Sequence, residues 1–314
     1  MENLKGKTAF ITGGASGIGL GLAKACAKEG MNVVIADLRQ SAIDEAVPIF
    51  EENNWPVLAI QLDVTDRKAY EKAVDLAEAK FGNIHLLANN AGIGGGRGPL
   101  WEVSYAQTDV AININLTAVL NGIQIIVPRM LEHGEGGHIV NTASKAALIA
   151  VPQNGLYNMT KQALVGITET LQSDLAGTNV TASVFFPGPF ATTLGQTSVE
   201  IEAQFLGSEA KAPAPPPPPP PDDGTPRPSL SEMSALVRSA DEAGERILRG
   251  VKRGDMYIIT HAEFKEGFKE RVDAMLRAFP DEKPNEKFKE AFGFLVHNPV
   301  FNKQKDVPAF EKKD

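Results

Sequence analysis

The sequence predicts an α/β fold, a doubly wound parallel sheet of seven strands with helices on both faces and a helical extension at its C-terminal end. Two observations predict it. Short apolar segments alternate with longer helix-like segments over the first two-thirds of the 314 residues, and a glycine-rich turn joins the first strand to the first helix. Strands that are separated by helices form parallel sheets covered on both faces.

The individual elements follow from the spacing of their apolar residues. Runs of five to eight mostly apolar residues predict buried strands over 8–12, 33–37, 57–64, 84–89, 137–142, 180–186 and 256–260. Between the strands, apolar residues recur at helical spacing, which predicts helices over 17–29, 40–52, 66–81, 105–132, 153–176 and 230–250.

Two segments depart from this alternation. The proline-rich insertion at 212–221, with an unbroken proline run at 215–221, cannot form a helix or a central strand, so we expect an extended, solvated loop. A docking site for a proline-binding module is the other interpretation. Beyond residue 261, apolar residues recur at helical spacing as far as Leu295, which predicts helices that pack on the chain's own body or on a second subunit.

Composition and charge exclude several kinds of partner. The formal net charge is −8, whereas nucleic acids and anionic membranes bind clustered Lys and Arg, so we expect neither as a partner. The single cysteine, Cys26, allows no internal disulfide, and the five histidines show no ligand spacing, so no metal site is expected. No uninterrupted apolar stretch reaches membrane-spanning length, so we expect a cytoplasmic protein.

The glycine-rich turn at 12–19 is the first candidate ligand site. Its spacing is G-x-x-x-G-x-G, directly after a strand and at the start of a helix. Glycine lets backbone N–H groups approach a pyrophosphate, which the positive end of the helix dipole attracts. A glycine-rich loop without a ligand is the plainer interpretation of the turn alone. In its strand–turn–helix context we expect a Rossmann-like domain that binds a dinucleotide, with contacts from Gly13, Ser16, Gly17, Ile18 and Gly19.

Asp37, at the end of the second strand, indicates which dinucleotide is bound. A carboxylate there can accept hydrogen bonds from both ribose hydroxyls of the adenosine half, and it repels a 2′-phosphate. Arg39 opposes this interpretation, because a guanidinium can hold that phosphate. We therefore expect NAD, with NADP as the less favoured cofactor.

Tyr157 and Lys161 are four positions apart, so a helix would place them on one face. A phenol has a pKa of about 10 and is a poor base, but a nearby ammonium favours the phenolate. Ser144 follows the strand at 137–142, where its hydroxyl would face the ligand crevice of a parallel sheet. Taken singly, Tyr157 and Lys161 could be an exposed surface pair, and Ser144 could be a helix cap. Together they indicate proton transfer at an alcohol or a carbonyl.

In their order and spacing, the segments 12–19 and 89–92, with Ser144, Tyr157, Lys161 and the Pro187–Gly188 pair, resemble the short-chain dehydrogenase/reductase family. The resemblance covers about residues 5–190 closely and the strand at 256–260 loosely. It implies a Rossmann-type catalytic domain over 1–260, a substrate loop or lid over 192–232, and an extension over 261–314. The strand and tail after 256 are similar to the branch that includes bacterial dehydrogenases of bulky aryl alcohols.

The resemblance also implies roles for individual residues. Tyr157 would be the general acid/base, assisted by Ser144 and Lys161, while the backbone carbonyl of Asn115, rather than of Asn113, would hold a proton-relaying water. The implied cofactor contacts beyond the glycine turn are Asp37, Asp63, Val64, Asn90, Gly92, Tyr157, Lys161, Pro187, Gly188 and Thr192. The expected substrate contacts are Ser144, Leu148, Asn154, Tyr157 and Phe190.

The expected function is NAD(P)-dependent interconversion of a secondary alcohol and a ketone by hydride transfer, on a bulky aromatic or alicyclic substrate. Such an enzyme acts on CH–OH donors and needs no metal. A catalytically silent cofactor-binding regulatory protein and a scaffold that recruits partners through the proline run are the alternatives. We expect a homodimer or homotetramer formed through the helices at 105–132 and 153–176.

Overall fold

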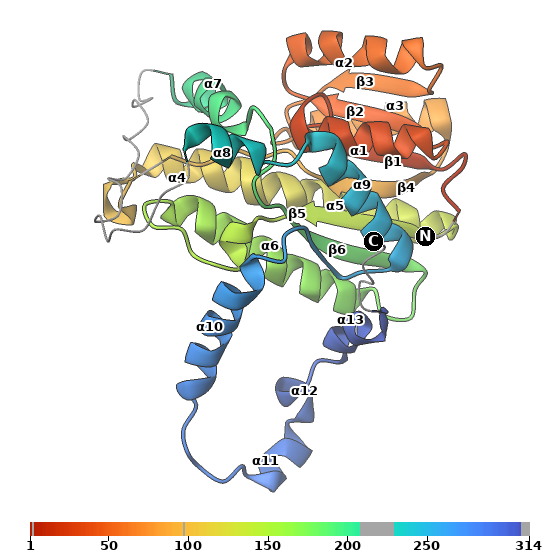
Figure 1. The fold of residues 1–314 in the computed structure, drawn as a ribbon. Helices are drawn as coiled ribbons and strands as arrows, with labels where there is room; N and C mark the ends of the chain where they lie inside the picture. The colour runs from red at the N-terminus through yellow and green to blue at the C-terminus, as the bar shows by residue number, and fades with distance from the viewer. Residues whose placement is uncertain (2, 97, 208–228, 309–314) are drawn as a thin grey trace.

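The computed structural model describes residues 1, 3–96, 98–207 and 229–308 (Figure 1). The proline-rich insertion at 212–221 lies outside these residues. Seven parallel strands form one sheet in the order β3-β2-β1-β4-β5-β6-β7. The strands are β1 Thr8–Thr12, β2 Asn32–Asp37, β3 Val57–Gln61, β4 Ile84–Asn89, β5 Gly137–Thr142, β6 Val180–Phe186 and β7 Tyr257–Ile259. The predicted doubly wound sheet is confirmed.

Helices cover both faces of the sheet, because successive strand residues point to opposite sides. Phe10 packs in one core cluster with α3 and α5, whereas the next residue, Ile11, packs in another with α1, α2 and α9. A third cluster joins β6 to α5, α6 and the segment that follows β5. The bounds are α1 Gly17–Lys28, α2 Gln40–Glu52, α3 Arg67–Phe81, α5 Ala118–His133, α6 Gly155–Asp174 and α9 Ala240–Arg253.

The structure differs from the predicted elements at three places. β3 ends at Gln61 rather than at residue 64, because Asp63 accepts hydrogen bonds from the backbone and hydroxyl of Thr65 in a turn before α3. The helix predicted over 230–250 is two helices, α8 Leu230–Ala235 and α9. Helix α7, Leu194–Leu206, occupies the start of the segment expected to be a loop.

The helix predicted over 105–132 extends from Tyr105 to His133 and contains a π-helical turn. It comprises α4 Tyr105–Ile112, the π-turn η2 Asn113–Thr117 and α5. By length and composition alone this helix could cross a membrane, with a mean hydropathy of 1.7. Half of that window is buried inside the protein, as in the core helix of a globular domain.

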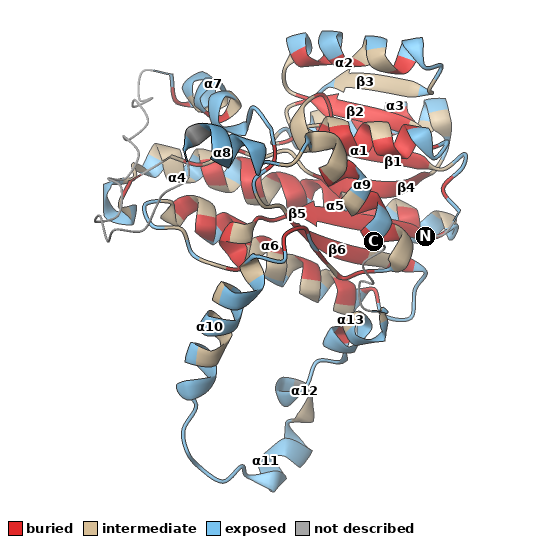
Figure 2. Ribbon diagram, viewed as in Figure 1, coloured by how far each residue is buried: buried red, intermediate tan, exposed pale blue. Residues whose placement is uncertain are grey.

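The C-terminal extension leaves the body of the molecule and returns to it (Figure 1). It contains α10 Phe264–Arg277, α11 Glu286–Ala291, α12 Gly293–Val296 and α13 Asn302–Asp306. Within α10 none of the described residues is buried, and most of the extension is exposed (Figure 2). The returning end is anchored at the edge of the sheet, where Gln304 Oε1 accepts hydrogen bonds from the backbone N–H groups of Met256 and Tyr257.

Close packing of α1 on α9 depends on two glycines. A Cβ on Gly244 would lie 2.2 Å from the carbonyl carbon and oxygen of Gly21. We expect Gly244→Ala to lower the free energy of unfolding by about 1 to 3 kcal/mol, because the helices must separate. A Cβ on Gly195 of α7 would meet no described atom within 4 Å, so Gly195→Ala is the control. Chemical denaturation measures the free energy of unfolding of both variants. Equal values for Gly244→Ala and Gly195→Ala would contradict the close packing of α1 on α9.

Candidate active site

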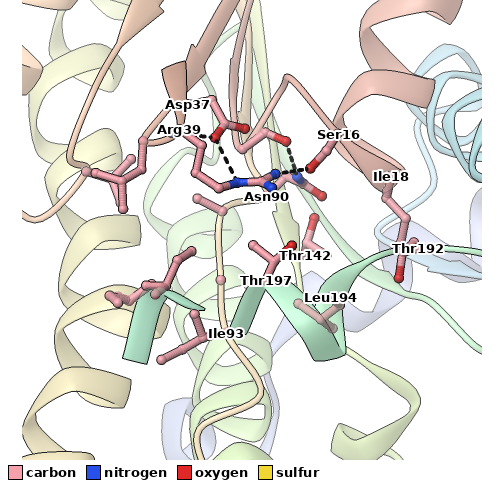
Figure 3. Close-up of a pocket in the computed structure, with 18 of the residues that line it drawn as sticks. Ser16, Ile18, Asp37, Arg39, Asn90, Ile93, Thr142, Thr192, Leu194 and Thr197 are labelled. Carbon is pink, nitrogen blue, oxygen red and sulfur yellow. Dashed lines mark hydrogen bonds and ion pairs between the residues drawn. The ribbon is translucent and has the colours of Figure 1, made fainter. Parts of the chain in front are cut away.

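A cleft opens at the carboxyl end of the sheet, where β1 lies between β2 and β4 and the strand order reverses. The glycine turn, the ends of β2, β4 and β5, and helices α6 and α7 line it (Figure 3). Its lining includes these predicted cofactor contacts: Gly13, Ser16, Gly17, Ile18, Asp37, Asp63, Val64, Asn90, Gly92, Tyr157, Lys161, Pro187 and Thr192.

The glycine turn has the backbone geometry that requires glycine. Gly13 and Gly17 have φ values of 60° and 50°, a region that side chains disfavour. Gly19 does not line the cleft, but a Cβ there would lie 2.0 Å from the carbonyl oxygen of Gly13. Among the described residues, no side chain caps the N-terminus of α1. The first-turn N–H groups therefore remain open to an anionic ligand.

Asn90 holds the glycine turn against the end of β4. Its Nδ2 donates to the carbonyl oxygens of Thr12 and Gly13 at 3.1 and 3.3 Å, and its N–H donates to the Thr12 hydroxyl at 3.0 Å. A Cβ on Gly92 would lie 3.0 Å from Asn115 Oδ1 and 3.3 Å from Lys161 Nζ. This close approach explains why glycine suits that position.

Asp37 and Arg39 form one polar group at the far end of the cleft (Figure 3). The buried carboxylate of Asp37 accepts hydrogen bonds from the N–H groups of Ala15, at 3.2 Å, and Arg39, at 3.1 Å. Arg39 Nη2 donates to Ser16 Oγ at 2.8 Å, and its Nε lies 3.8 Å from Asp37 Oδ1. A carboxylate has about four acceptor sites, so Asp37 retains capacity for ribose hydroxyls.

Tyr157 lines the other end of the cleft, and Ser144 lies beside it. Burial raises the pKa of the Tyr157 phenol, and its hydrogen bond with Ser144 opposes that rise. The Ser144 hydroxyl also accepts a hydrogen bond from the N–H of Ala146 at 3.1 Å. The serine is thus held by the turn that follows it and lies beside the phenol.

Lys161 is buried beside Tyr157. Its Nζ lies 5.6 Å from the centroid of the Tyr157 ring and donates to the carbonyl oxygen of Thr142 at 2.9 Å. Burial lowers the pKa of Lys161 from 10.5 to about 8. A positive charge at this distance favours the phenolate form of Tyr157.

The lowered pKa of Lys161 predicts a stability cost. The folded state binds this proton less tightly than the unfolded state, so folding is penalised fully below pH 8, and the penalty fades from about pH 8 to 10.5. We expect Lys161→Met to raise the free energy of unfolding at neutral pH by about 1 to 2 kcal/mol while abolishing turnover. Denaturation of both proteins across this range tests it. A stability difference that does not narrow as pH rises would contradict it.

Asn115 lies in the π-turn η2. Its side chain accepts from the N–H of Ile93 at 2.8 Å and donates to the carbonyl of Ile93 at 3.0 Å and to Thr160 Oγ1 at 3.1 Å. Asn113 is exposed, whereas Asn115 is buried. This supports the choice of Asn115, and π-turns are frequent at functional sites.

Several predicted contacts lie outside the cleft in the part of the chain that the structure describes. Leu148 packs in the core cluster with Val184 and Phe186 of β6, and both it and Phe190 are buried. The Phe190 ring packs edge-on against the His261 ring, with the centroids 5.5 Å apart. Asn154 precedes α6 and pairs with Gly98. Gly188 packs closely against His261, because a Cβ at this position would lie 2.4 Å from the His261 ring.

Helix α7 contributes a wall that sequence reasoning missed. Thr197, Ile201 and Phe205 line the cleft together with Leu194. Ser198 Oγ accepts from the N–H of Gly94 at 2.8 Å. One oxygen of Glu202 accepts from the N–H groups of Gly95 and Gly96 at 3.1 and 3.2 Å. The absence of glycine and proline from residues 196–206 was the signal for a helix here.

The fold and this site identify the class of protein. Residues 7–203 match the short chain dehydrogenase family. The chain belongs to this family of oxidoreductases, whose members bind a nicotinamide cofactor and act on small-molecule alcohols or ketones.

Individual relatives match most of the chain. It is 31% identical over 277 residues to a C alpha-dehydrogenase from Sphingobium sp., covering 88% of this chain and 87% of that protein. The LigO structure from Sphingobium sp. strain SYK-6 superimposes with a TM-score of 0.71 at 32% identity, over 98% of this chain and 100% of that one. A family member from Burkholderia phymatum in complex with NAD gives a TM-score of 0.75 at 30% identity, over 91% and 100% of the two chains.

The residues present fit a nicotinamide dinucleotide. The cleft joins a carboxylate for ribose hydroxyls, an uncapped helix N-terminus for the pyrophosphate, and a phenol–amine pair at the opposite end. Among the described residues, no group of three or more His, Cys, Asp or Glu side chains is placed to hold a metal ion.

Proposed function

We propose that this chain is an NAD-dependent dehydrogenase or ketoreductase that interconverts a secondary alcohol and a ketone, with Tyr157 as general acid/base. The observation that carries the proposal is that Tyr157 and Lys161 line one end of a cleft whose other end holds Asp37, with Ser144 beside Tyr157. A silent cofactor-binding protein or a scaffold would not require these three side chains to converge.

The residues have distinct parts in the reaction. Ser144 donates a hydrogen bond to the substrate oxygen, and Tyr157 takes the hydroxyl proton as the carbinol carbon becomes a carbonyl carbon. The bound nicotinamide supplies the acceptor for the hydride that leaves this carbon. Lys161 favours the phenolate by its charge, and the Asn115 backbone holds the water through which the proton departs. In the reverse direction Tyr157 gives the proton to the carbonyl oxygen.

The proposed substrate is bulky and aromatic or alicyclic. Leu194, Ile201 and Phe205 of α7 line the cleft together with Ile93 and make part of its wall apolar. The similarity to the Sphingobium C alpha-dehydrogenase extends over 88% of the chain and so beyond the nucleotide-binding half. Asp37 supports NAD over NADP, because its buried carboxylate repels a 2′-phosphate.

A panel of alcohols and ketones tests the proposal. Secondary aryl and alicyclic alcohols are assayed with NAD and with NADP, and the matching ketones with the reduced cofactors, by the absorbance of the reduced nicotinamide. Turnover of bulky secondary alcohols with NAD is the expected result. Activity confined to short polyols or sugars would contradict the substrate class.

We also propose a cytoplasmic homodimer or homotetramer assembled through the helix Tyr105–His133 and α6. Exposed apolar side chains on these helices, Leu120, Leu131 and Met159, support an interface there. Light scattering on the purified protein measures the assembly, and a monomer would contradict it.

We further propose that 1–260 form the catalytic domain and that α7 begins a substrate lid within 192–232.

A further inference from the structure

The C-terminal extension contacts the turn that carries Ser144. This turn is a 3-10 helix, η3 Lys145–Ala147, and Ser144 is its N-cap. Arg271 of α10 donates from Nη1 to the carbonyl oxygens of Ala147 at 2.9 Å and Leu148 at 3.1 Å. Arg271 lies beyond residues 7–203, the part of the chain that matches the family.

The contact is part of a packed interface. A Cβ on Gly267, one helical turn before Arg271, would lie 2.9 Å from Ile149 Cδ1, so α10 approaches the turn closely. Phe264 at the start of α10 packs against the cluster that contains Ala147 and Leu148. The guanidinium, partly buried, meets carbonyls at the C-terminal end of η3, where a positive charge is favourable.

The turn η3 connects the Arg271 contact to Ser144. Its second residue holds the serine, since Ser144 Oγ accepts a hydrogen bond from the N–H of Ala146. Its start is tied to the cleft by the hydrogen bond from the N–H of Lys145 to the carbonyl oxygen of Pro187 at 3.0 Å. Its end is held by Arg271. The orientation of the Ser144 hydroxyl toward Tyr157 therefore depends on both ends of a short, constrained segment.

We propose that Arg271 is a positioning residue for the reaction, which binds the Ala147 and Leu148 carbonyls and so fixes the turn that aims Ser144 at Tyr157. This inference rests on the proposed role of Ser144. It gives the C-terminal extension a part in catalysis, although none of its described residues lines the cleft. A displaced hydroxyl would weaken its hydrogen bond to the reacting oxygen more than it would weaken cofactor binding.

Three variants separate this role from general stability. Arg271→Met keeps an unbranched apolar side chain and removes the hydrogen-bond donors, and Arg271→Lys restores one donor group. Arg277→Met, on an exposed position of the same helix, is the matched control. Hydrogen exchange of the amides at 144–149, followed by mass spectrometry, should be faster in Arg271→Met, partly restored in Arg271→Lys and unchanged in the control. Unchanged exchange in Arg271→Met would overturn the proposal.

Kinetics then test the consequence. We expect Arg271→Met to lower kcat by about 10-fold, with the KM for NAD unchanged and partial recovery in Arg271→Lys. In a Ser144→Ala background the same change should have no further effect, because the two residues act through one hydroxyl. Independent, multiplying losses, or an unaltered kcat, would overturn the proposal. If the wild-type protein turns over no alcohol or ketone, the proposed function fails, and the exchange measurement still decides whether Arg271 holds the turn.

Discussion

Tyr157→Phe is expected to lower kcat by about 10²- to 10⁴-fold while NAD still binds. The substitution removes only the phenolic oxygen, which is the atom that we propose exchanges a proton with the substrate. The ring stays beside Lys161, whose Nζ is 5.6 Å from its centroid, and so continues to line the cleft. Initial rates measure the first effect, and calorimetric titration with NAD measures the second.

Tyr105→Phe is the control for this variant, because it removes the same oxygen from a side chain that is 92% exposed. Its rate and NAD affinity should match those of the wild-type protein. If Tyr157→Phe retained full activity, another group would have to transfer the proton. If it lost NAD binding in parallel with its rate, Tyr157 would be a cofactor contact rather than the acid/base.

Asp37→Ser is expected to change the preference between cofactors, lowering the ratio of kcat/KM for NAD over NADP by about 10²- to 10³-fold. Two effects multiply. The ribose hydroxyls of NAD lose a charged acceptor, and the 2′-phosphate of NADP no longer meets a buried carboxylate. The measurement is kcat/KM for both cofactors with one alcohol at fixed pH.

Arg39 provides the matching test, since it lines the same end of the cleft and its guanidinium donates a hydrogen bond to Ser16. Arg39→Met should leave NAD use nearly unchanged and weaken NADP use further. Because Asp37 also accepts hydrogen bonds from Ala15 and Arg39, the melting temperature of Asp37→Ser is recorded alongside. A ratio unaltered in a folded Asp37→Ser protein would remove Asp37 as the selectivity residue.

Most of the fold could be predicted because its signals are local. Each strand is a short apolar run, and its neighbours in the chain are helices with clear starting residues, such as Asp66, which caps α3. The end of β3 could not be predicted, since residues 61–64 alternate polar and apolar side chains, a pattern that also fits a strand. Hydrophobicity alone does not separate a strand from the extended chain beyond it.

The site was predictable only in part, because the same type of side chain can line a ligand site or pack in the core. Leu148 and Phe190 are apolar residues near the catalytic segment, and the sequence cannot tell whether such a residue faces a ligand or the core; both are buried in the core. Ser198, Glu202 and Arg271 act on backbone groups of distant segments. Contacts between a side chain and a distant carbonyl or N–H leave no pattern in the sequence around either partner.

Direct transfer of hydrogen between substrate and cofactor is the most immediate measurement of the central claim. A secondary alcohol that carries deuterium on its carbinol carbon is incubated with the protein and NAD in ordinary water, and the reduced cofactor is analysed by mass spectrometry and NMR. We predict that the deuterium is found on C4 of the nicotinamide and that Tyr157→Phe forms almost none of this product. Unlabelled reduced cofactor, or no reduction of NAD by any secondary alcohol, would contradict the account.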